Sequence, residues 1–365
     1  MSSGFPEWAY AAGLASLPLQ TPARLRRLLS KGSPREMWVA VTEGERPLPG
    51  IDDVLWRTWE ASNDEHVESV ADDCKRHNIH VLWRHDEQYP VALLADPSAP
   101  AVLFARGDVS ALRQRRVGIV GTRTATQRGR FLARQLGQEL SASHVGVVSG
   151  LARGIDVQSH IGALSVTTSA QPIGVVASGV CCVYPPEHRD VWERIAHDGV
   201  LLSEVPPHAA PETHRFPLRN RILAALSEVL VVVESHARGG SMSTVREAMK
   251  RDITVMAVPG SPGVASCEGT NNLLRDGCAP VVDVNDVLIA LGLDTRRRDQ
   301  ACDVRRAPQG DERRLLEIIG STPRTLDEIA LLAGCTVVDA ALTLGRLEEM
   351  GWVDFRDGWW DALVV

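Results

Sequence analysis

The sequence predicts an α/β protein with a doubly wound parallel sheet, an N-terminal helical domain before it and a C-terminal winged-helix domain after it. Short β-branched runs alternate with helical stretches through the middle of the chain, as in doubly wound sheets. The chain then closes on three helical patterns followed by a hairpin signal. The 365 residues, 44% hydrophobic and 23% charged, have the composition of an ordinary globular protein and suffice for two or three domains.

Residues 1–75 are expected to form the helical domain, of a SAM-like or helix-hairpin-like type. Pro and Gly divide this part into short segments, and Leu25, Leu28 and Leu29 recur at helical spacing. We expect this domain to serve packing rather than binding. The predicted helices cover residues 8–17, 22–30, 34–40 and 52–59.

The second predicted domain, residues 76–293, carries the sheet. Its central apolar runs are short, β-branched and not interrupted by polar residues, as expected for strands buried on both faces. Helical segments separate most of these runs, which is the pattern of a parallel sheet. The predicted strands cover residues 79–83, 102–104, 117–120, 145–148, 173–177, 200–202, 229–233, 254–258 and 281–282.

A linker is predicted at residues 294–309, where arginines and Pro308 replace the apolar runs. Helical patterns follow at 311–319, 325–333 and 337–350, and Asp357-Gly358 between two apolar runs is a strong hairpin signal. Three helices and a hairpin predict a winged helix over residues 310–365. Acidic residues outnumber basic ones there, so we expect this domain to contact protein rather than duplex DNA.

Composition excludes several classes of protein. No apolar run approaches the length of a membrane span, and the N-terminus lacks the order of a secretory signal. The seven cysteines are an odd number with no CxxC pair and no metal-ligand spacing. We therefore expect buried thiols in a reducing cytoplasm, with no metal and no membrane association.

The charge of the chain is sorted along the sequence. The net charge of −7 argues mildly against nucleic acid, but seven arginines and no acid fall between Leu112 and Leu136. One of them belongs to Gly121-Thr122-Arg123, directly after a predicted strand. Glycine allows a tight turn, the hydroxyl and guanidinium can bind an anion, and a helix beginning near Thr126 would point its N-terminal amides at the same place.

Similar chemistry follows five further predicted strands, and parallel strands place their carboxyl ends at one edge of a sheet. Asp156 is expected to cap the helix that follows, and His160 to be a packing residue. At least five strand ends with small residues, hydroxyls and arginines predict a polyanionic ligand. The other loops hold Ser149-Gly150 with Arg153, Ser178-Gly179 with Tyr184, Arg219-Asn220-Arg221, Gly239-Gly240-Ser241 and Gly269-Thr270.

The motifs of common nucleotide enzymes are missing. The sequence has no GxxxxGK[ST] loop, no GxGxxG fingerprint, no GxSxG elbow and no paired nucleophile and base. We therefore expect no catalytic residue and no cofactor, and a binding protein rather than an enzyme.

Taken together and in order, the motifs from Trp83 to Val282 resemble those of the DNA-processing protein A family (DprA/Smf). This resemblance implies an extended Rossmann-like domain that binds single-stranded DNA and dimerises with a second copy. It also implies a mediator that protects incoming strands and loads the RecA recombinase during natural transformation or recombination. The matching motifs include Ser149-Gly-Leu-Ala-Arg-Gly-Ile-Asp156, Tyr184-Pro-Pro186, Phe216-Pro-Leu-Arg-Asn-Arg-Ile222, Val258-Pro-Gly260 and Gly269-Thr-Asn271.

Carried over by position, the resemblance implies a DNA pocket in which arginines hold backbone phosphates. Tyr184 and Phe216 are the candidates for base stacking. The chain departs from the family pattern at Val180-Cys181-Cys182, where an Asp is usual, and at Glu187-His188, where a basic residue or Asn often stands. The predicted DNA-binding residues are Gly121, Thr122, Arg123, Ser149, Gly150, Arg153, Arg219, Asn220, Arg221, Gly240 and Ser241.

Two other functions remain open at this point. One is a nucleotide-hydrolysing phosphoribohydrolase of related Rossmann fold, although its GGxGTxxE signature is not reproduced at Gly239-Gly240. The other is a sensor of a small phosphorylated ligand.

Overall fold

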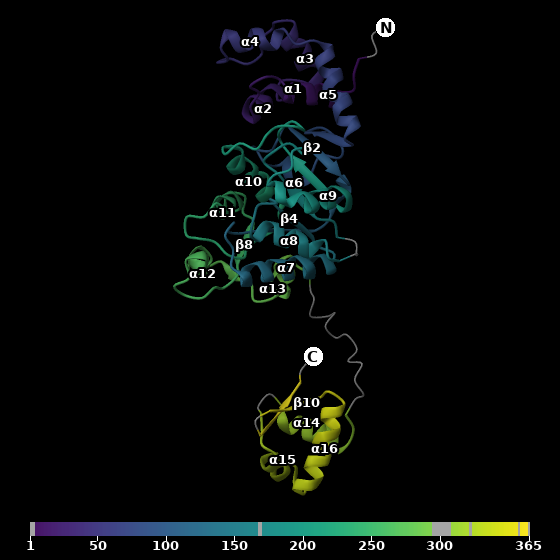
Figure 1. The fold of residues 1–365 in the computed structure, drawn as a ribbon, viewed down its shortest axis with the longest axis vertical. Helices are drawn as coiled ribbons and strands as arrows, with labels where there is room; N and C mark the ends of the chain where they lie inside the picture. Colours follow the sequence, from purple (N-terminus) through teal and green to yellow (C-terminus); the bar gives the residue numbers. More distant parts are fainter. Residues whose placement is uncertain (1–3, 167–169, 294–307, 321–322, 357, 364–365) are drawn as a thin grey trace. The chain divides into compact units, whose positions relative to one another are not determined.

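The computed structural model describes residues 4–166, 170–293, 308–320, 323–356 and 358–363. It contains two compact units, Met1–Leu293 and Asp294–Val365 (Figure 1). Most of the predicted linker, residues 294–307, lies outside the described residues, as do Cys302 and Asp357.

Five helices form the N-terminal region. Thr21, Ser33 and Asp52 each accept a backbone N–H at the start of a helix, which satisfies amides that the helix itself leaves free. The fifth helix was not predicted, because only Val67, Ala71 and Cys74 are buried along a largely charged segment. The helices are α1 (Glu7–Ala15), α2 (Pro22–Leu29), α3 (Pro34–Thr42), α4 (Asp53–Glu60) and α5 (Asp64–Arg76).

A nine-stranded sheet forms the centre of the larger unit, in the order β1-β2-β6-β5-β4-β3-β7-β8-β9. Strands β3 to β9 run parallel, as predicted, whereas β1 and β2 at one edge pair antiparallel. The strands are β1 (Ile79–Trp83), β2 (Val102–Gly107), β3 (Arg116–Val120), β4 (Gly146–Ser149), β5 (Ile173–Val175), β6 (Val200–Ser203), β7 (Val229–Val232), β8 (Thr254–Ala257) and β9 (Ala279–Pro280). The last strand lies two residues before its predicted position.

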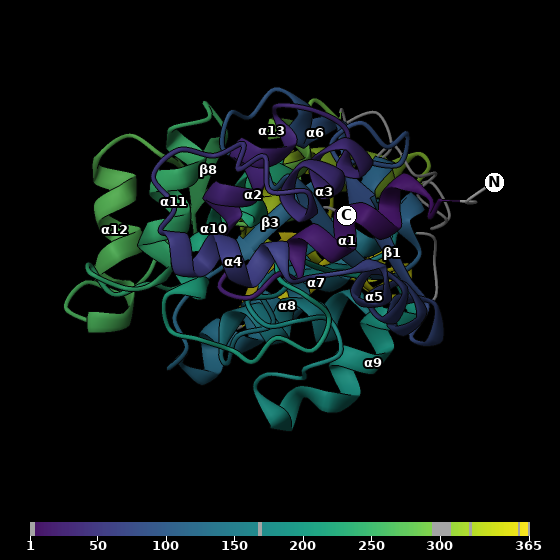
Figure 2. The same cartoon turned by 90° about the horizontal axis from the view of Figure 1, so that it is seen from above.

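Both faces of the sheet are covered, which explains the unbroken apolar runs. Along β7, Val231 packs into one core with α7 and α13, while Leu230 and Val232 pack into another with α10 and α11. Figure 2 shows α11 and α12 together at one side of this unit. The covering helices are α6 (Val91–Leu94), α7 (Gln127–Ala142), α8 (Ile155–Ala163), α9 (Arg189–Asp198), α10 (Arg215–Leu226), α11 (Ser241–Met249), α12 (Glu268–Arg275) and α13 (Val284–Ala290), with 3-10 turns at Val109–Arg113, Pro186–His188 and Ala265–Cys267.

The sheet reverses its winding beside β3. From β3 the chain winds through β4, β5 and β6 toward one edge, and it then returns to β7 on the other side of β3. The loops after β3 and β7 therefore lead away to opposite faces and leave a crevice at the carboxyl ends of the strands, the usual ligand position in this class of sheet.

The N-terminal helices share a hydrophobic core with the sheet domain. Trp59 and Leu28 belong to the same buried cluster as Trp192 and Ile195 of α9. Arg26 of α2 also donates to the carbonyl oxygen of Ser98 at 3.1 Å. The helical region is thus packed as one body with the sheet.

The smaller unit is a winged helix, as predicted. It consists of α14 (Asp311–Ile319), α15 (Leu326–Ala333) and α16 (Val337–Glu349), followed by the antiparallel pair β10 (Val353–Arg356) and β11 (Trp359–Ala362). Leu315, Ile329 and Leu344 are buried in its core. No single helix in the described part of the chain is long and apolar enough to cross a membrane; α15 and α16 reach that length and composition only together, across a bend of 108°.

The six described cysteines are free thiols, but most of them are not fully buried. Cys74 and Cys267 are buried, as predicted. The thiols of Cys181, Cys182, Cys278 and Cys335 belong to partly exposed residues, which corrects the prediction for those four.

Candidate nucleic-acid interface

A cleft of about 500 Å³ opens at the predicted position, where the loops after β3, β4, β5 and β7 meet the start of α10. Its walls combine polar side chains with small and apolar residues. The cleft is lined by Gly121, Thr122 and Arg123 after β3, Ala152 and Asp156 after β4, Tyr184 after β5, Thr213, Phe216, Arg219 and Asn220 at α10, and His236, Gly239, Gly240 and Ser241 after β7.

Arg123 is the free cation of this cleft. Its guanidinium lies over the ring of Phe216, with Cζ 5.1 Å from the ring centroid. Phe216 in turn packs against Tyr184 at a centroid distance of 5.7 Å. Across the described ranges the Arg123 side chain is exposed and has neither a hydrogen bond nor an ion pair. Its charge therefore remains available to an anion, beside two aromatic faces.

Arg219 lies at the floor of the cleft and is committed to the protein. It is buried, and its Nη1 donates to the carbonyl oxygens of Gly150, at 2.7 Å, and Val175. Burial lowers the pKa of this guanidinium to about 10, so it stays charged at neutral pH. A side chain at Gly150 would overlap it, since a Cβ there would lie 2.2 Å from Arg219 Nη1. Arg219 thus joins the ends of β4 and β5 and supports the loop from Gly150 to Arg153.

Asp156 places a carboxylate at the same floor. Helix α8 begins after Gly154, so Asp156 lies in its first turn rather than capping it. Burial raises the pKa of Asp156 to about 6, although Arg219 and the amides of Ala152 and Gly121 favour its ionised form. His160, one turn further on, is fully buried, and burial lowers its pKa to about 4, so it packs as a neutral ring. The cleft therefore contains a carboxylate that titrates just below neutral pH.

Arg153 lies at the rim, in a recess that also contains Arg123, Tyr184 and Phe216. Its Nε donates to Glu187 Oε1 at 2.5 Å, and both side chains are about half exposed. This contact raises the pKa of Arg153 and lowers that of Glu187. Glu187, where the chain departs from the family pattern, thus pairs its carboxylate with Arg153, a residue predicted to bind phosphate.

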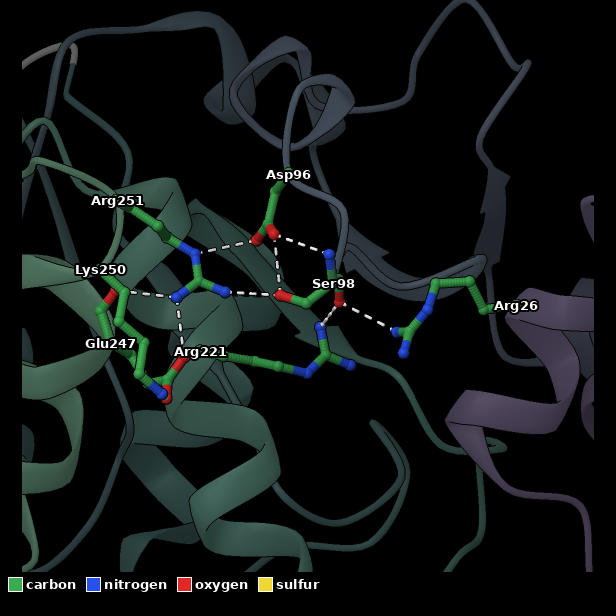
Figure 3. A network of polar contacts seen from close by, with 7 residues as sticks. All are labelled: Arg26, Asp96, Ser98, Arg221, Glu247, Lys250 and Arg251. Carbon is green, nitrogen blue, oxygen red and sulfur yellow. Dashed lines mark hydrogen bonds and ion pairs between the residues drawn. The ribbon is translucent and has the colours of Figure 1, made fainter.

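Arg221 does not reach the cleft, which corrects its predicted placement there. It is buried on the other side of α10, where it pairs with the buried carboxylate of Glu204 and donates to the carbonyl oxygen of Ser98. Figure 3 shows that Arg26 approaches the same Ser98 carbonyl and that Arg251 and Asp96 complete this network. Arg221 therefore belongs to the contact between the N-terminal helices and the sheet domain.

Ser149 also lies away from the cleft surface. It is fully buried, and its hydroxyl donates to the carbonyl oxygen of Ile119 at 2.6 Å, which joins β4 to β3. Asn220 does line the cleft, and it donates to Ser243 Oγ at 2.6 Å while accepting from Arg219. Its amide thus connects α10 to α11.

The N-terminus of α7 is not an open anion site, contrary to the sequence prediction. The Glu234 carboxylate accepts from the Thr126 amide at 3.0 Å and from its hydroxyl at 2.5 Å. It fits closely, since a Cβ at Gly129 would lie within 2.6 Å of both its oxygens. An internal carboxylate therefore takes the place that a phosphate would have needed.

The start of α11 is the open helix N-terminus of the cleft. Gly240 is exposed, and within the described residues neither its amide nor that of Ser241 donates a hydrogen bond. The Ser241 hydroxyl pairs with that of Ser235 at 2.8 Å, which holds the loop. Amides at a helix N-terminus attract anions.

His236 and Thr213 line the cleft but were not among the predicted site residues. His236 stands two residues after Glu234, just past the carboxyl end of β7. The expectation that ligands bind at the carboxyl ends of parallel strands could therefore have identified it. Thr213 lies in a loop before α10, and no sequence signal marks it.

Comparison with known proteins agrees with this architecture. The family model described as DNA recombination-mediator protein A matches residues 80–292, and that of the DprA winged helix domain matches residues 303–358. The chain is 32% identical to a putative DNA processing protein DprA of Mycobacterium tuberculosis, over 98% of this chain and 94% of that protein. It is 36% identical to the protein Smf of Synechocystis over 59% of this chain, and that match spans about half (54%) of the Smf protein.

Two solved structures are similar in fold. DNA processing protein A of Streptococcus pneumoniae superposes with a TM-score of 0.67 and 26% identity, over 78% of this chain and 98% of that one. The Helicobacter pylori protein, whose structure is described as giving insight into its single-stranded DNA binding mode, has a TM-score of 0.54 and 28% identity, over 59% and 96%.

Proposed function

Because this chain belongs to the DNA recombination-mediator protein A family, we propose that its cleft binds the backbone of single-stranded DNA. Arg123 would neutralise a phosphate at the mouth of the cleft, and the open amides of Gly240 and Ser241 would receive a neighbouring phosphate oxygen. The observation that carries this proposal is the unpaired guanidinium of Arg123 over the Phe216 ring, 5.1 Å from its centroid.

The same rim favours a single strand over a duplex. Phe216 and Tyr184 lie beside Arg123 and the recess of Arg153, so a strand whose phosphate sits on Arg123 could turn a base onto an aromatic face. Bases in a duplex are already stacked on one another and cannot do this without unpairing. Stacking on aromatic side chains tolerates any base, so we expect little sequence preference.

We further propose that the bound strand is passed to the RecA recombinase and that the chain acts as a homodimer through its sheet domain. The description of the family as recombination mediators supports the first of these proposals. The rate of RecA assembly on strands coated with single-strand-binding protein tests it, and no acceleration would contradict it. Light scattering across a concentration series tests the dimer.

A binder is favoured over an enzyme at this site. Of the side chains that line the cleft, Asp156 is buried against Arg219, and none forms a nucleophile with an adjacent base. Incubation with nucleoside monophosphates would test the phosphoribohydrolase alternative, and release of free base would support it.

The winged helix is proposed to contact a protein. Leu331, Val338 and Leu342 are more than 60% exposed on α15 and α16, two helices that pack against each other, and an exposed apolar patch on them would suit a protein interface. Tight binding of the full chain to duplex DNA that is lost on deleting residues 308–365 would contradict this proposal.

An equilibrium titration tests the DNA proposal directly. Labelled single strands and duplexes of the same length are titrated at two ionic strengths. Single strands should bind more tightly, with log K falling in proportion to log salt by about 0.7 for each phosphate neutralised. Equal affinity for both forms, or no salt dependence, would contradict a phosphate-binding cleft for single strands.

A further inference from the structure

Three potential metal ligands meet between the N-terminal helices and the sheet domain, away from the cleft. They are His77 at the C-terminal end of α5, Cys181 in the loop after β5, and His208 in the loop after β6. A ring nitrogen of each histidine and the Cys181 sulfur all lie within 4.8 Å of one another. Among the described residues, no other three histidine, cysteine or carboxylate side chains place their ligand atoms this close together.

Asp73 orients both imidazole rings. Its carboxylate oxygens lie 3.2 Å from Nδ1 of His77 and 2.9 Å from Nε2 of His208, and the Asp73 carbonyl is 3.0 Å from the same His77 nitrogen. These contacts leave Nε2 of His77 and Nδ1 of His208 for another partner. A carboxylate or carbonyl that holds the second nitrogen of a metal-bound histidine is the usual outer shell of such sites.

The backbone holds the two loops in a fixed relation. Cys181 N–H donates to the carbonyl oxygen of Pro207 at 2.9 Å, and Gly179 N–H donates to that of Ala209 at 2.8 Å. The approach is so close that a Cβ at Gly179 would lie 2.1 Å from the Pro207 oxygen. Cys181 and His208 are therefore positioned relative to each other by the fold itself.

We propose that His77, Cys181 and His208 bind one zinc ion. A thiolate and two imidazoles suit a borderline-soft cation and exclude magnesium or calcium, which prefer oxygen ligands. Ligand atoms of a tetrahedral zinc site lie about 3.5 Å apart, so the three atoms, all within 4.8 Å of one another, would move closer together around the ion. Binding displaces the proton of the Cys181 thiol into solvent, and the thiolate together with Asp73 balances the two positive charges.

The fourth position would be held by water. The His208 side chain is 56% exposed, so solvent reaches this side of the group. Arg76, whose guanidinium is 3.9 Å from Asp73, shares the outer shell. The ion would join α5 to the loop that continues from Cys181 to Tyr184, and so fasten the N-terminal helices to one wall of the cleft.

Cobalt provides a direct test with the full chain. The reduced protein is freed of metal by chelation and titrated with Co²⁺, which gives a thiolate charge-transfer absorption when a cysteine is a ligand. We expect saturation at one equivalent per chain and loss of the band when Zn²⁺ is added. C181S and H208A should lose the band, whereas C182S, which changes a neighbouring thiol outside the group, should keep it.

A thermal measurement gives a second readout. Zinc should raise the Tm of the parent protein and of C182S but not of C181S, because an ion that binds only the folded state stabilises it. Circular dichroism of the metal-free variants verifies that each is folded. An absent band in the parent, or a band of equal strength in folded C181S, would overturn the proposal and leave Asp73 and the two histidines as a hydrogen-bonded contact.

Discussion

Replacing Arg123 with alanine tests the proposed DNA site most directly. The side chain is exposed, has no ion pair among the described residues and contacts the ring of Phe216, so its removal should leave the fold intact. The loss of one phosphate contact changes the slope of log K against log salt by about 0.7 for a single strand. R123A should therefore bind the strand about fivefold more weakly than the parent at 0.1 M salt. Raising the salt from 0.05 to 0.2 M should weaken the binding of R123A by a factor about 2.6 times smaller than the factor for the parent.

Fluorescence anisotropy with a labelled oligonucleotide measures both quantities. Arg134→Ala is the matched control, because it removes the same charge from an exposed position on α7 that does not line the cleft. The effect should be similar for all base sequences, since phosphate contacts carry no sequence information. If R123A and R134A change affinity and salt slope equally, the reasoning that places the strand on Arg123 is refuted.

Three further changes have definite expected outcomes. Glu187→Gln should free Arg153 to meet a phosphate, giving several-fold tighter binding at low salt and a steeper salt dependence, and unchanged anisotropy titrations would contradict this. Arg221→Ala breaks a buried ion pair and should lower the free energy of unfolding by about 3–5 kcal/mol in denaturant titrations, with no change in salt slope for the folded protein. The pKa of Asp156 is raised to about 6, so the carboxylate becomes neutral as the pH falls from 7.5 to 5, and DNA affinity should rise with a midpoint near pH 6. Asp156→Asn should abolish that rise, and a rise of the same size in the folded variant would contradict the assignment to Asp156.

The sequence predicted the strands well because burial on both faces leaves few other residues possible. In residues 229–233, for example, Leu230 and Val231 enter cores on opposite faces of the sheet. Both positions must therefore be apolar, and the run shows no amphipathic alternation. The antiparallel pairing of β2 with β1 and β6 depends on how the chain returns to the sheet edge, which local composition does not encode. Helix α5 was missed because its buried face consists of Val67, Ala71 and Cys74 within a largely charged segment, and it packs mainly against α1 and β1.

The expectation that ligands bind at the carboxyl ends of parallel strands located the loops of the candidate site. The direction of each side chain decided which residues enter it. Arg219 and Arg221 are two residues apart on a helix and therefore point about 200° apart. One faces the cleft and the other faces Ser98 and Glu204. The group of His77, Cys181 and His208 could not be predicted at all, since tertiary structure alone brings these distant positions together.

The carboxylate of Glu234, which lies at the start of α7, has a consequence for discrimination between ligands. In many proteins of this architecture a single phosphate group is gripped by a helix terminus, and a mononucleotide can gain most of its affinity there. At α7 that position is filled by the carboxylate of Glu234, which leaves the start of α11 as the open helix N-terminus of the cleft. A ligand must therefore gain its affinity from several weaker contacts along the cleft. The linked nucleotides of a polymer occupy these contacts at high effective concentration, which a single nucleotide cannot do. Cellular nucleotides at millimolar levels would thus compete poorly with even a short strand.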